Sequence, residues 1–122
     1  MLALKKIFTF IAILLVVGCT AGTFENVTSE QAKEMIDQGE VIILDVRNPD
    51  EYNRGHIADS ELIPLPVIEG MSEELDKEKS YLVVCRSGNR SQQAAEILIG
   101  KGFKNIYNMT GGMNSWSYTI EQ

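Results

Sequence analysis

The sequence predicts one α/β domain built on a mainly parallel central sheet with helices on both faces. Two continuous apolar runs, at 41–44 and 81–84, have the composition of strands that are buried on both faces. Segments with helical patterns alternate with the strand candidates along the chain, an order typical of parallel sheets. The 122 residues, 44% of them hydrophobic, suffice for one compact domain.

Each predicted element has a local reason in the sequence. Thr28 and Gln31 have the capping-box spacing at the start of the first helix, and Asn48 followed by Pro49 is a favourable cap and first turn for the second. Gly102 follows the longest helical pattern at the position where helices commonly end. In order, the predicted elements are a strand at 24–27, a helix to about residue 38, a strand at 41–44, a short helix from 49 that Gly55 stops, a strand at 62–65, a helix at 72–77, a strand at 81–84, a helix at 91–101, a strand at 105–109 and a short helix around Trp116.

The amino end predicts an export signal that is separate from the domain. Lys5 and Lys6 precede an 11-residue apolar run at 7–17, and Gly18 and Cys19 follow it. A membrane-spanning helix needs about 20 apolar residues, so this run is too short for an ordinary span. The sequence therefore indicates a secretory signal peptide at 1–18 and a domain at 24–122.

Residues 16–19, Val-Val-Gly-Cys, also resemble the lipobox of bacterial lipoproteins. In that family the signal is cut before the cysteine, which is then acylated. The resemblance implies lipid attachment at Cys19, a tether at 19–23, and a location in the cell envelope, either periplasmic or on the outer surface, with a lipid anchor in a membrane. A plain signal peptide that leaves Cys19 unmodified is the alternative.

The charge balance argues against nucleic acid as a partner. The whole chain has a formal net charge of −6, and loss of Lys5 and Lys6 with the signal leaves nine basic and 17 acidic residues, a net charge of −8. No basic stripe interrupts this acidic composition. The positive charge of interest is local, at Arg86 and Arg90.

Cys85 is the candidate nucleophile. The chain has two cysteines, so acylation of Cys19 leaves Cys85 without a disulfide partner. Cys85 follows a buried strand and faces the predicted amino end of a helix, where the helix dipole and loop N–H groups favour negative charge. A thiol in this setting is expected to be a thiolate near neutral pH. An inert, buried cysteine is the alternative.

The loop after Cys85 is suited to anions. Its backbone N–H groups can converge on a bound oxyanion or on a charged sulfur, and Gly88 permits a tight bend. Arg86 and Arg90 can add charge-assisted hydrogen bonds, whereas Ser87 and Asn89 can serve as turn formers that contribute only their N–H groups. The predicted binding residues are Arg86, Ser87, Gly88, Asn89, Arg90 and Ser91.

Four features in order resemble the single-domain rhodanese family and together cover residues 24–117. They are Asp45-Val46-Arg47, then Glu51-Tyr52 with Gly55-His56-Ile57, then the segment 85–91 of sequence Cys-Arg-Ser-Gly-Asn-Arg-Ser, and finally Gly111-Gly112 with Trp116. The resemblance implies a rhodanese-like fold and transfer of a sulfane sulfur through a persulfide on Cys85. It implies a small anionic donor, thiosulfate or a persulfide, and cyanide or a thiol as acceptor. It implies neither a metal nor an organic cofactor.

Other residues of these motifs are expected to support the site rather than to react. Asp45 and Arg47 lie near the site because both follow a strand end, and support of the loop is their expected role. His56 is the only histidine, but a preformed thiolate needs no base, so His56 is interpreted as scaffold. Glu51 is interpreted as a structural partner and Trp116 as core packing.

One departure from the family pattern follows His56. The family commonly has glycine and alanine after its Gly-His-Ile segment, whereas this chain has Ala58-Asp59. Aspartate tolerates a left-handed backbone better than most residues, so we expect the turn to survive.

Two functions of other classes remain open from the sequence. A phosphatase or arsenate reductase would also use a cysteine and an arginine in an anion-binding loop, but its usual pattern places five residues between them, and here four separate Cys85 from Arg90. A non-catalytic interaction module that kept the fold is the second alternative, and the intact Cys85 argues against it.

Overall fold

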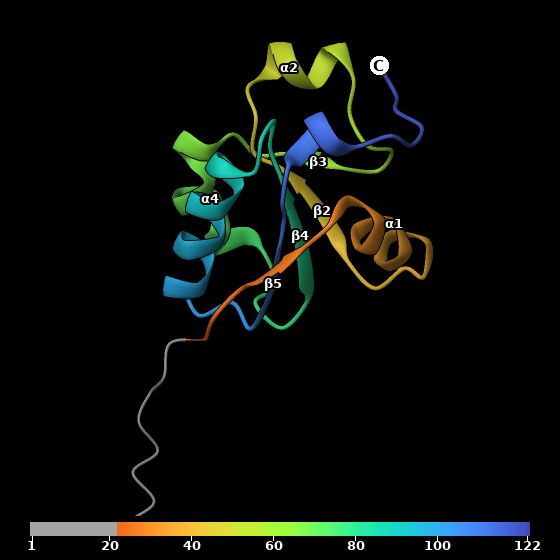
Figure 1. Cartoon of the computed structure of the whole chain (residues 1–122). Helices are drawn as coiled ribbons and strands as arrows, with labels where there is room; N and C mark the ends of the chain where they lie inside the picture. The colour runs from red at the N-terminus through yellow and green to blue at the C-terminus, as the bar shows by residue number, and fades with distance from the viewer. Residues whose placement is uncertain (1–21) are drawn as a thin grey trace, which may run out of the picture.

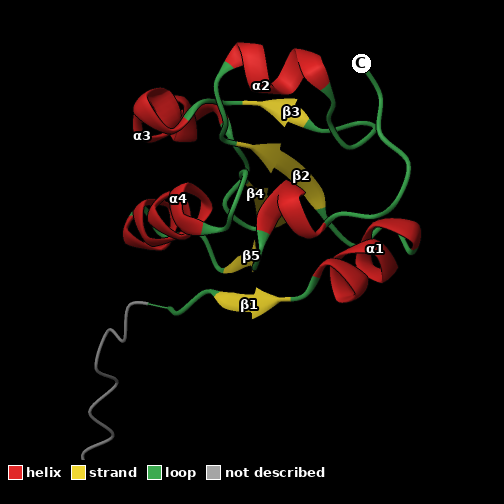
Figure 2. Cartoon of the chain, turned by 45° about the horizontal axis from the view of Figure 1, so that its top comes forward, coloured by secondary structure: helices red, strands yellow, loops and turns green. Residues whose placement is uncertain are grey.

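Five parallel strands form the centre of the domain in the computed structural model, which describes residues 22–122. Their order across the sheet is β1-β5-β4-β2-β3, and Figure 2 shows this succession from the lower to the upper edge. The strands are β1 (Glu25–Val27), β2 (Ile42–Asp45), β3 (Glu61–Leu62), β4 (Ser80–Val84) and β5 (Asn105–Met109). The predicted α/β class with a mainly parallel sheet is confirmed.

Helices cover both faces of the sheet. The α-helices are α1 (Ser29–Asp37), α2 (Pro49–Arg54), α3 (Ile68–Met71) and α4 (Asn89–Gly100), and the 3₁₀ turns are η1 (Leu65–Val67), η2 (Ser72–Glu74) and η3 (Gly112–Ser115). In Figure 1, α4 lies on one side of the strands and α1 on the other, while α2 lies above the carboxyl ends of the strands. The capping boxes predicted at Thr28 and Asn48 are both present.

The alternation of side chains along β4 divides the core into two clusters. Tyr81, Val83 and Cys85 belong to the cluster that packs against α4, and Leu82 and Val84 belong to the cluster on the α1 side. All five side chains are at most 1% exposed. The central strand thus anchors the site residue Cys85 at a rigid position, because both of its faces are packed.

Two predicted helices differ from those observed. The helix expected at 91–101 begins at Asn89, because Gly88 adopts a left-handed backbone with φ 97° and turns the chain into the helix two residues earlier. The helix expected at 72–77 is replaced by the run η1, α3 and η2 over residues 65–74, which ends where Leu75 becomes extended.

The departure after His56 is accommodated as expected. Asp59 has φ 64° and is the one residue other than glycine with a positive φ within residues 22–122. The signal peptide and the lipid attachment at Cys19 lie outside the described residues. Across 22–122, no helix is long and apolar enough to cross a membrane.

Candidate active site

The Cys85 side chain lies in a loop between the end of β4 and the start of α4. Its Sγ accepts a hydrogen bond from the Gly88 N–H at 3.0 Å and lies 3.3 Å from the Ser91 hydroxyl oxygen. Cys85 and Ser91 are both fully buried, whereas Arg86, Ser87 and Asn89 are exposed. The loop therefore surrounds the buried Cys85 sulfur with hydrogen-bond donors.

These hydrogen bonds outweigh the cost of burial for the charged thiolate. Burial alone raises the pKa of the Cys85 thiol, but hydrogen bonds from the Ser91 side chain and from the backbone N–H groups of Ser91, Ser87 and Gly88 lower it, and the net shift of the pKa is downward. The amino end of the 12-residue helix α4 adds a favourable field. The geometry thus favours a nucleophilic sulfur.

The Ser91 hydroxyl provides a test of this balance. Removing it in Ser91→Ala takes away a hydrogen bond that lowers the Cys85 pKa, so the pKa should rise. Because the thiolate exists above its pKa, the acid limb of the pH dependence of Cys85 alkylation should move to higher pH. Alkylation rates measured between pH 5 and 9 check this, with Gln92→Ala at an exposed position of α4 as the control. An unchanged acid limb in Ser91→Ala would contradict it.

The short turn η3 holds the Cys85 loop from the other side. The Met113 N–H donates to the Cys85 carbonyl oxygen at 2.8 Å, and the Asn114 N–H donates to the Arg86 carbonyl oxygen at 2.9 Å. Gly112 permits this approach, because a Cβ built there would lie 2.6 Å from the Arg86 carbonyl oxygen. The Gly111-Gly112 pair therefore positions the loop backbone as well as forming a turn.

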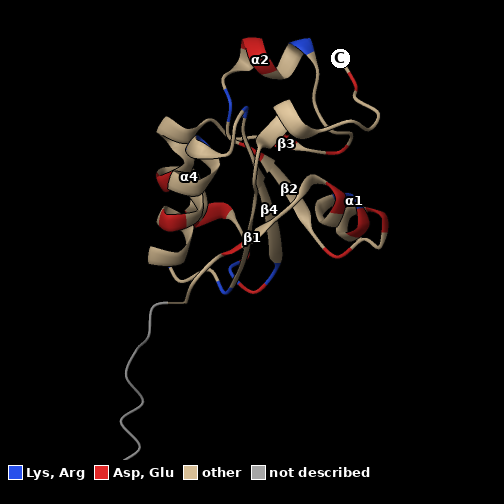
Figure 3. Ribbon diagram, in the orientation of Figure 1, with Lys and Arg blue, Asp and Glu red and all other residues tan. Residues whose placement is uncertain are grey.

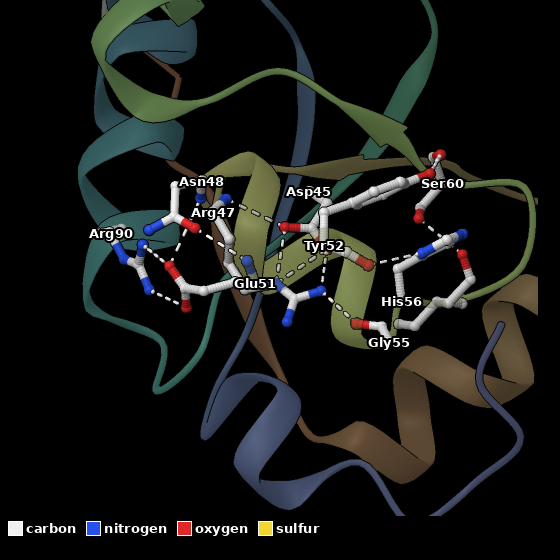
Figure 4. Close-up of polar contacts among 10 residues, drawn as sticks. Asp45, Arg47, Asn48, Glu51, Tyr52, Gly55, His56, Ser60 and Arg90 are labelled. Atoms are coloured by element: carbon white, nitrogen blue, oxygen red, sulfur yellow. Dashed lines mark hydrogen bonds and ion pairs between the residues drawn. The ribbon is translucent and has the colours of Figure 1, made fainter. Parts of the chain in front are cut away.

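The two arginines of the loop have different surroundings. Arg90 forms a bidentate ion pair with Glu51 of α2, at 2.7 and 2.8 Å, so its guanidinium is already committed (Figure 4). The hydrogen bonds that Arg90 donates to the Glu51 carboxylate raise the Arg90 pKa, and the negative charges of Glu51 and Cys85 contribute further in the same direction. Arg86 has no ion-pair partner within residues 22–122 and lines a cavity beside the loop.

The Arg90–Glu51 pair should stabilise the fold in a pH-dependent way. The hydrogen bond from the Arg90 side chain is the largest contribution that lowers the Glu51 pKa from 4.5 to about 2. A lowered carboxyl pKa stabilises the folded state fully above pH 4.5, and this contribution is lost as the pH falls toward 2. Glu51→Gln should therefore cost about 1–2 kcal/mol at pH 7, and the difference from wild type should vanish near pH 2. Urea unfolding at both pH values measures it, and a difference independent of pH would contradict it.

Asp45 and Arg47 form a buried ion pair at the end of β2. The Asp45 carboxylate accepts hydrogen bonds from the Arg47 Nε at 3.0 Å and from an Arg47 terminal nitrogen at 2.7 Å. The same nitrogen donates to the Gly55 carbonyl oxygen at 2.8 Å (Figure 4). This buried pair ties the end of α2 to the sheet, and it places Arg47 at the wall of the cavity.

A cavity of about 330 Å³ opens beside the Cys85 loop. It adjoins the loop because Arg86 lines it together with Met113 and Asn114, the two residues that hydrogen-bond the Cys85 and Arg86 carbonyls. Figure 3 shows basic residues near the carboxyl ends of the strands and at the end of α2, with acidic residues also on α2. The lining residues are Arg47, Glu51, Arg54, Gly55, Arg86, Met113, Asn114, Trp116 and Ile120.

Sequence reasoning missed several of these lining residues. Arg54 and Ile120 were not singled out, and Trp116, interpreted as core packing, packs on the core and also lines the cavity. His56 does not line it. The His56 ring stacks on Tyr52 with 3.7 Å between ring centroids, and its Nδ1 lies 2.9 Å from the Tyr52 carbonyl oxygen, as expected for a scaffold residue (Figure 4).

The described residues offer no evident metal site. Within 22–122, no group of three or more His, Cys, Asp or Glu side chains is arranged to hold a metal ion. The groups that line the site itself are the Cys85 thiol, the N–H groups of its loop and the arginines.

The Cys85 thiol is buried and hydrogen-bonded in a loop between a parallel strand and the amino end of a helix. This arrangement is typical of a class of α/β domains with a cysteine nucleophile at an anion site. The model of the family described as "Rhodanese-like domain" matches residues 28–119. The chain belongs to the rhodanese-like family.

Similar proteins support this assignment. A thiosulfate sulfurtransferase GlpE from Pseudomonas syringae pv. syringae is 38% identical over 99 residues, which cover 81% of this chain and 92% of that protein. The crystal structure of a rhodanese-like domain protein from Staphylococcus aureus aligns with a TM-score of 0.74 and 30% identity, covering 80% of this chain and 97% of that one. A rhodanese-related protein from Thermoplasma volcanium aligns with a TM-score of 0.74 and 34% identity, covering 80% and 98%.

Proposed function

We propose that this protein is a sulfurtransferase in which Cys85 carries a sulfane sulfur as a persulfide. The donor is thiosulfate or a persulfide, and the acceptor is cyanide or a thiol. The proposal rests on the surroundings of the Cys85 Sγ. This atom is buried in a loop where the Gly88 N–H and the Ser91 hydroxyl stabilise negative charge. The relatives named thiosulfate sulfurtransferase support the choice of donor.

The first half-reaction loads the enzyme. The Cys85 thiolate attacks the outer sulfur of thiosulfate, the S–S bond of thiosulfate breaks, and its electron pair leaves with sulfite. Two negative charges thus leave as sulfite, and one remains on the outer sulfur of the Cys85 persulfide. The N–H groups of Ser87, Gly88 and Ser91, which favour the charged thiolate, are available to stabilise that charge as well.

The second half-reaction restores the thiolate. Cyanide or an acceptor thiolate attacks the outer sulfur, the persulfide S–S bond breaks, and its electron pair returns to the Cys85 Sγ. The products are thiocyanate or an acceptor persulfide. The scheme is ping-pong, and it balances without an external oxidant or reductant.

Sulfite release without an acceptor tests this function. Thiosulfate added to the reduced protein should release one sulfite per Cys85 in a single burst, and cyanide should then permit continuous turnover. Absence of the burst in folded protein would contradict the proposal.

The ion pair of Arg90 favours sulfur transfer over phosphatase chemistry. A phosphatase of this kind needs the loop arginine to hold the phosphate, whereas Arg90 is bound to Glu51. Four residues rather than five separate it from Cys85, which makes a smaller loop. Turnover of an aryl phosphate without the sulfite burst would support the phosphatase instead. A protein with neither activity would be the non-catalytic module.

We also propose that the domain works in the cell envelope, attached to a membrane through acylated Cys19. The basis is the residue pattern at 5–19. In cells, labelled fatty acid should enter the full chain and the Cys85→Ser control, and Cys19→Ala should lose the label and leave the membrane fraction. Equal membrane association of Cys19→Ala would contradict the anchor.

A further inference from the structure

The cavity beside the Cys85 loop is larger than an inorganic sulfur anion requires. Its volume is about 330 Å³. This volume corresponds to about ten water molecules at about 30 Å³ each. Thiosulfate and cyanide are far smaller and would fill only part of it. The remaining space can hold the body of an organic substrate.

The arginines of the cavity leave two positive charges available. Arg47 is neutralised by Asp45, and Glu51 is neutralised by Arg90, with N–O distances of 2.7 Å in both pairs. Arg54 and Arg86 also line the cavity, and neither has an ion-pair partner within the described part of the chain. Both are therefore free to bind an anionic group of a substrate.

The carboxyl-terminal segment adds an apolar wall. Residues His56 and Glu121 form an antiparallel bridge through two backbone hydrogen bonds of 2.8 and 2.9 Å. This bridge seats Ile120 against Gly55, where an added Cβ would lie 2.6 Å from the Ile120 Cδ1. Ile120 nevertheless remains 46% exposed, at the cavity with Trp116. An apolar side chain is thus fixed in place with much of its surface uncovered.

We propose that this cavity selects acceptor thiols that combine a carboxylate with an aromatic or branched apolar body. Arg54 and Arg86 bind the carboxylate, and Trp116 and Ile120 contact the body. The inference rests on the proposed sulfur transfer and names the acceptor class. It makes Arg54 and Ile120 specificity-determining residues.

The chemical step is the second half-reaction. The outer sulfur of the Cys85 persulfide extends about 2 Å beyond Sγ. The acceptor gives its thiol proton to water and attacks that sulfur as a thiolate. The S–S bond breaks toward Cys85, and the acceptor leaves as its persulfide.

The test isolates that half-reaction. Protein loaded with sulfur from thiosulfate is desalted and mixed with one of three thiols, and the loss of the persulfide is followed by acid quench and intact mass. The thiols are 4-mercaptobenzoate, 4-mercaptobenzyl alcohol, which lacks the carboxylate, and mercaptoacetate, which lacks the aromatic body. For each thiol the wild-type rate is divided by the variant rate, which removes differences in intrinsic reactivity.

Two variants should slow sulfur transfer to different sets of thiols. Arg54→Ala should slow transfer to both carboxylates about tenfold and spare the alcohol, because one charged hydrogen bond is lost. Ile120→Ala should slow both aromatic thiols about fivefold and spare mercaptoacetate, because apolar contact is lost. Val67→Ala, 48% exposed and outside the cavity lining, is the matched control. Equal rate ratios for all three thiols in either variant would overturn the proposal.

A binding measurement separates this inference from the sulfurtransferase function. Trp116 is the only tryptophan of the chain, so its fluorescence reports on the cavity. In Cys85→Ser, 4-methylbenzoate should change the fluorescence at lower concentration than acetate or 4-methylbenzyl alcohol, and Arg54→Ala should weaken the effect. If the protein fails to load sulfur but shows the expected ligand preference in this titration, the sulfurtransferase function is refuted and the ligand preference of the cavity stands. Protein that loads sulfur and shows no preference among the three ligands refutes the inference alone.

Discussion

Cys85→Ser should abolish sulfur transfer while leaving the domain folded. The hydroxyl that replaces the thiol has nearly the same shape, and the Gly88 N–H and the Ser91 hydroxyl remain available as partners. Its oxygen is not ionised near neutral pH, so no nucleophile remains. Thiosulfate:cyanide activity should fall at least about 1,000-fold, as expected when an enzyme loses its nucleophile.

Stability distinguishes a lost nucleophile from a lost fold. The free energy of unfolding of Cys85→Ser should stay within about 1 kcal/mol of wild type, because the buried oxygen is hydrogen-bonded. Urea unfolding measures this on the same samples used for activity. Wild-type thiosulfate:cyanide activity in the folded variant would rule out Cys85 as the sulfur carrier.

Gly112→Ala should damage both the site and the fold, because the chain has no space for a side chain there. Gly112 has φ 55°, and an added Cβ would lie 2.6 Å from the Arg86 carbonyl oxygen. Relief of this clash would separate η3 from the loop and break the hydrogen bonds from Met113 and Asn114. We expect a loss of about 2–4 kcal/mol of stability and a displaced Cys85 loop with greatly reduced activity.

Gly39→Ala separates the clash from backbone strain. Gly39 has a similar φ of 69°, but nothing lies within 4 Å of an added Cβ. This control should lose about 1–2 kcal/mol from the left-handed backbone alone and keep its activity. Equal effects of the two substitutions on activity would show that η3 does not position the loop.

The sequence predicted the elements of the site that depend on neighbouring residues. The strand before Cys85, the polar loop and the following helix are continuous in the chain, and their patterns indicated a thiol at a helix amino end. The start of that helix was placed two residues too late, because Gly88 serves as its left-handed cap, a role that the helical pattern beginning at Ser91 did not reveal.

The features that could not be predicted join residues far apart in the chain. Arg90 and Glu51 are 39 residues apart, and nothing in the loop sequence indicates that Arg90 is paired while Arg86 remains free. The apolar wall depends on the bridge between His56 and Glu121. Because this bridge joins only one residue from each segment, neither segment has a strand pattern in its sequence that would predict it. Both features join α2, or the segment that follows it, to a distant part of the chain, and only the folded chain brings these parts together.

The proposed sulfur transfer depends on a persulfide that forms on Cys85. Intact-mass analysis of the purified domain after incubation with thiosulfate and desalting can detect this persulfide. The mass should increase by that of one sulfur atom, cyanide should reverse the increase, and Cys85→Ser should not show it. An unchanged mass in the folded wild-type domain, or the same gain in Cys85→Ser, would contradict it.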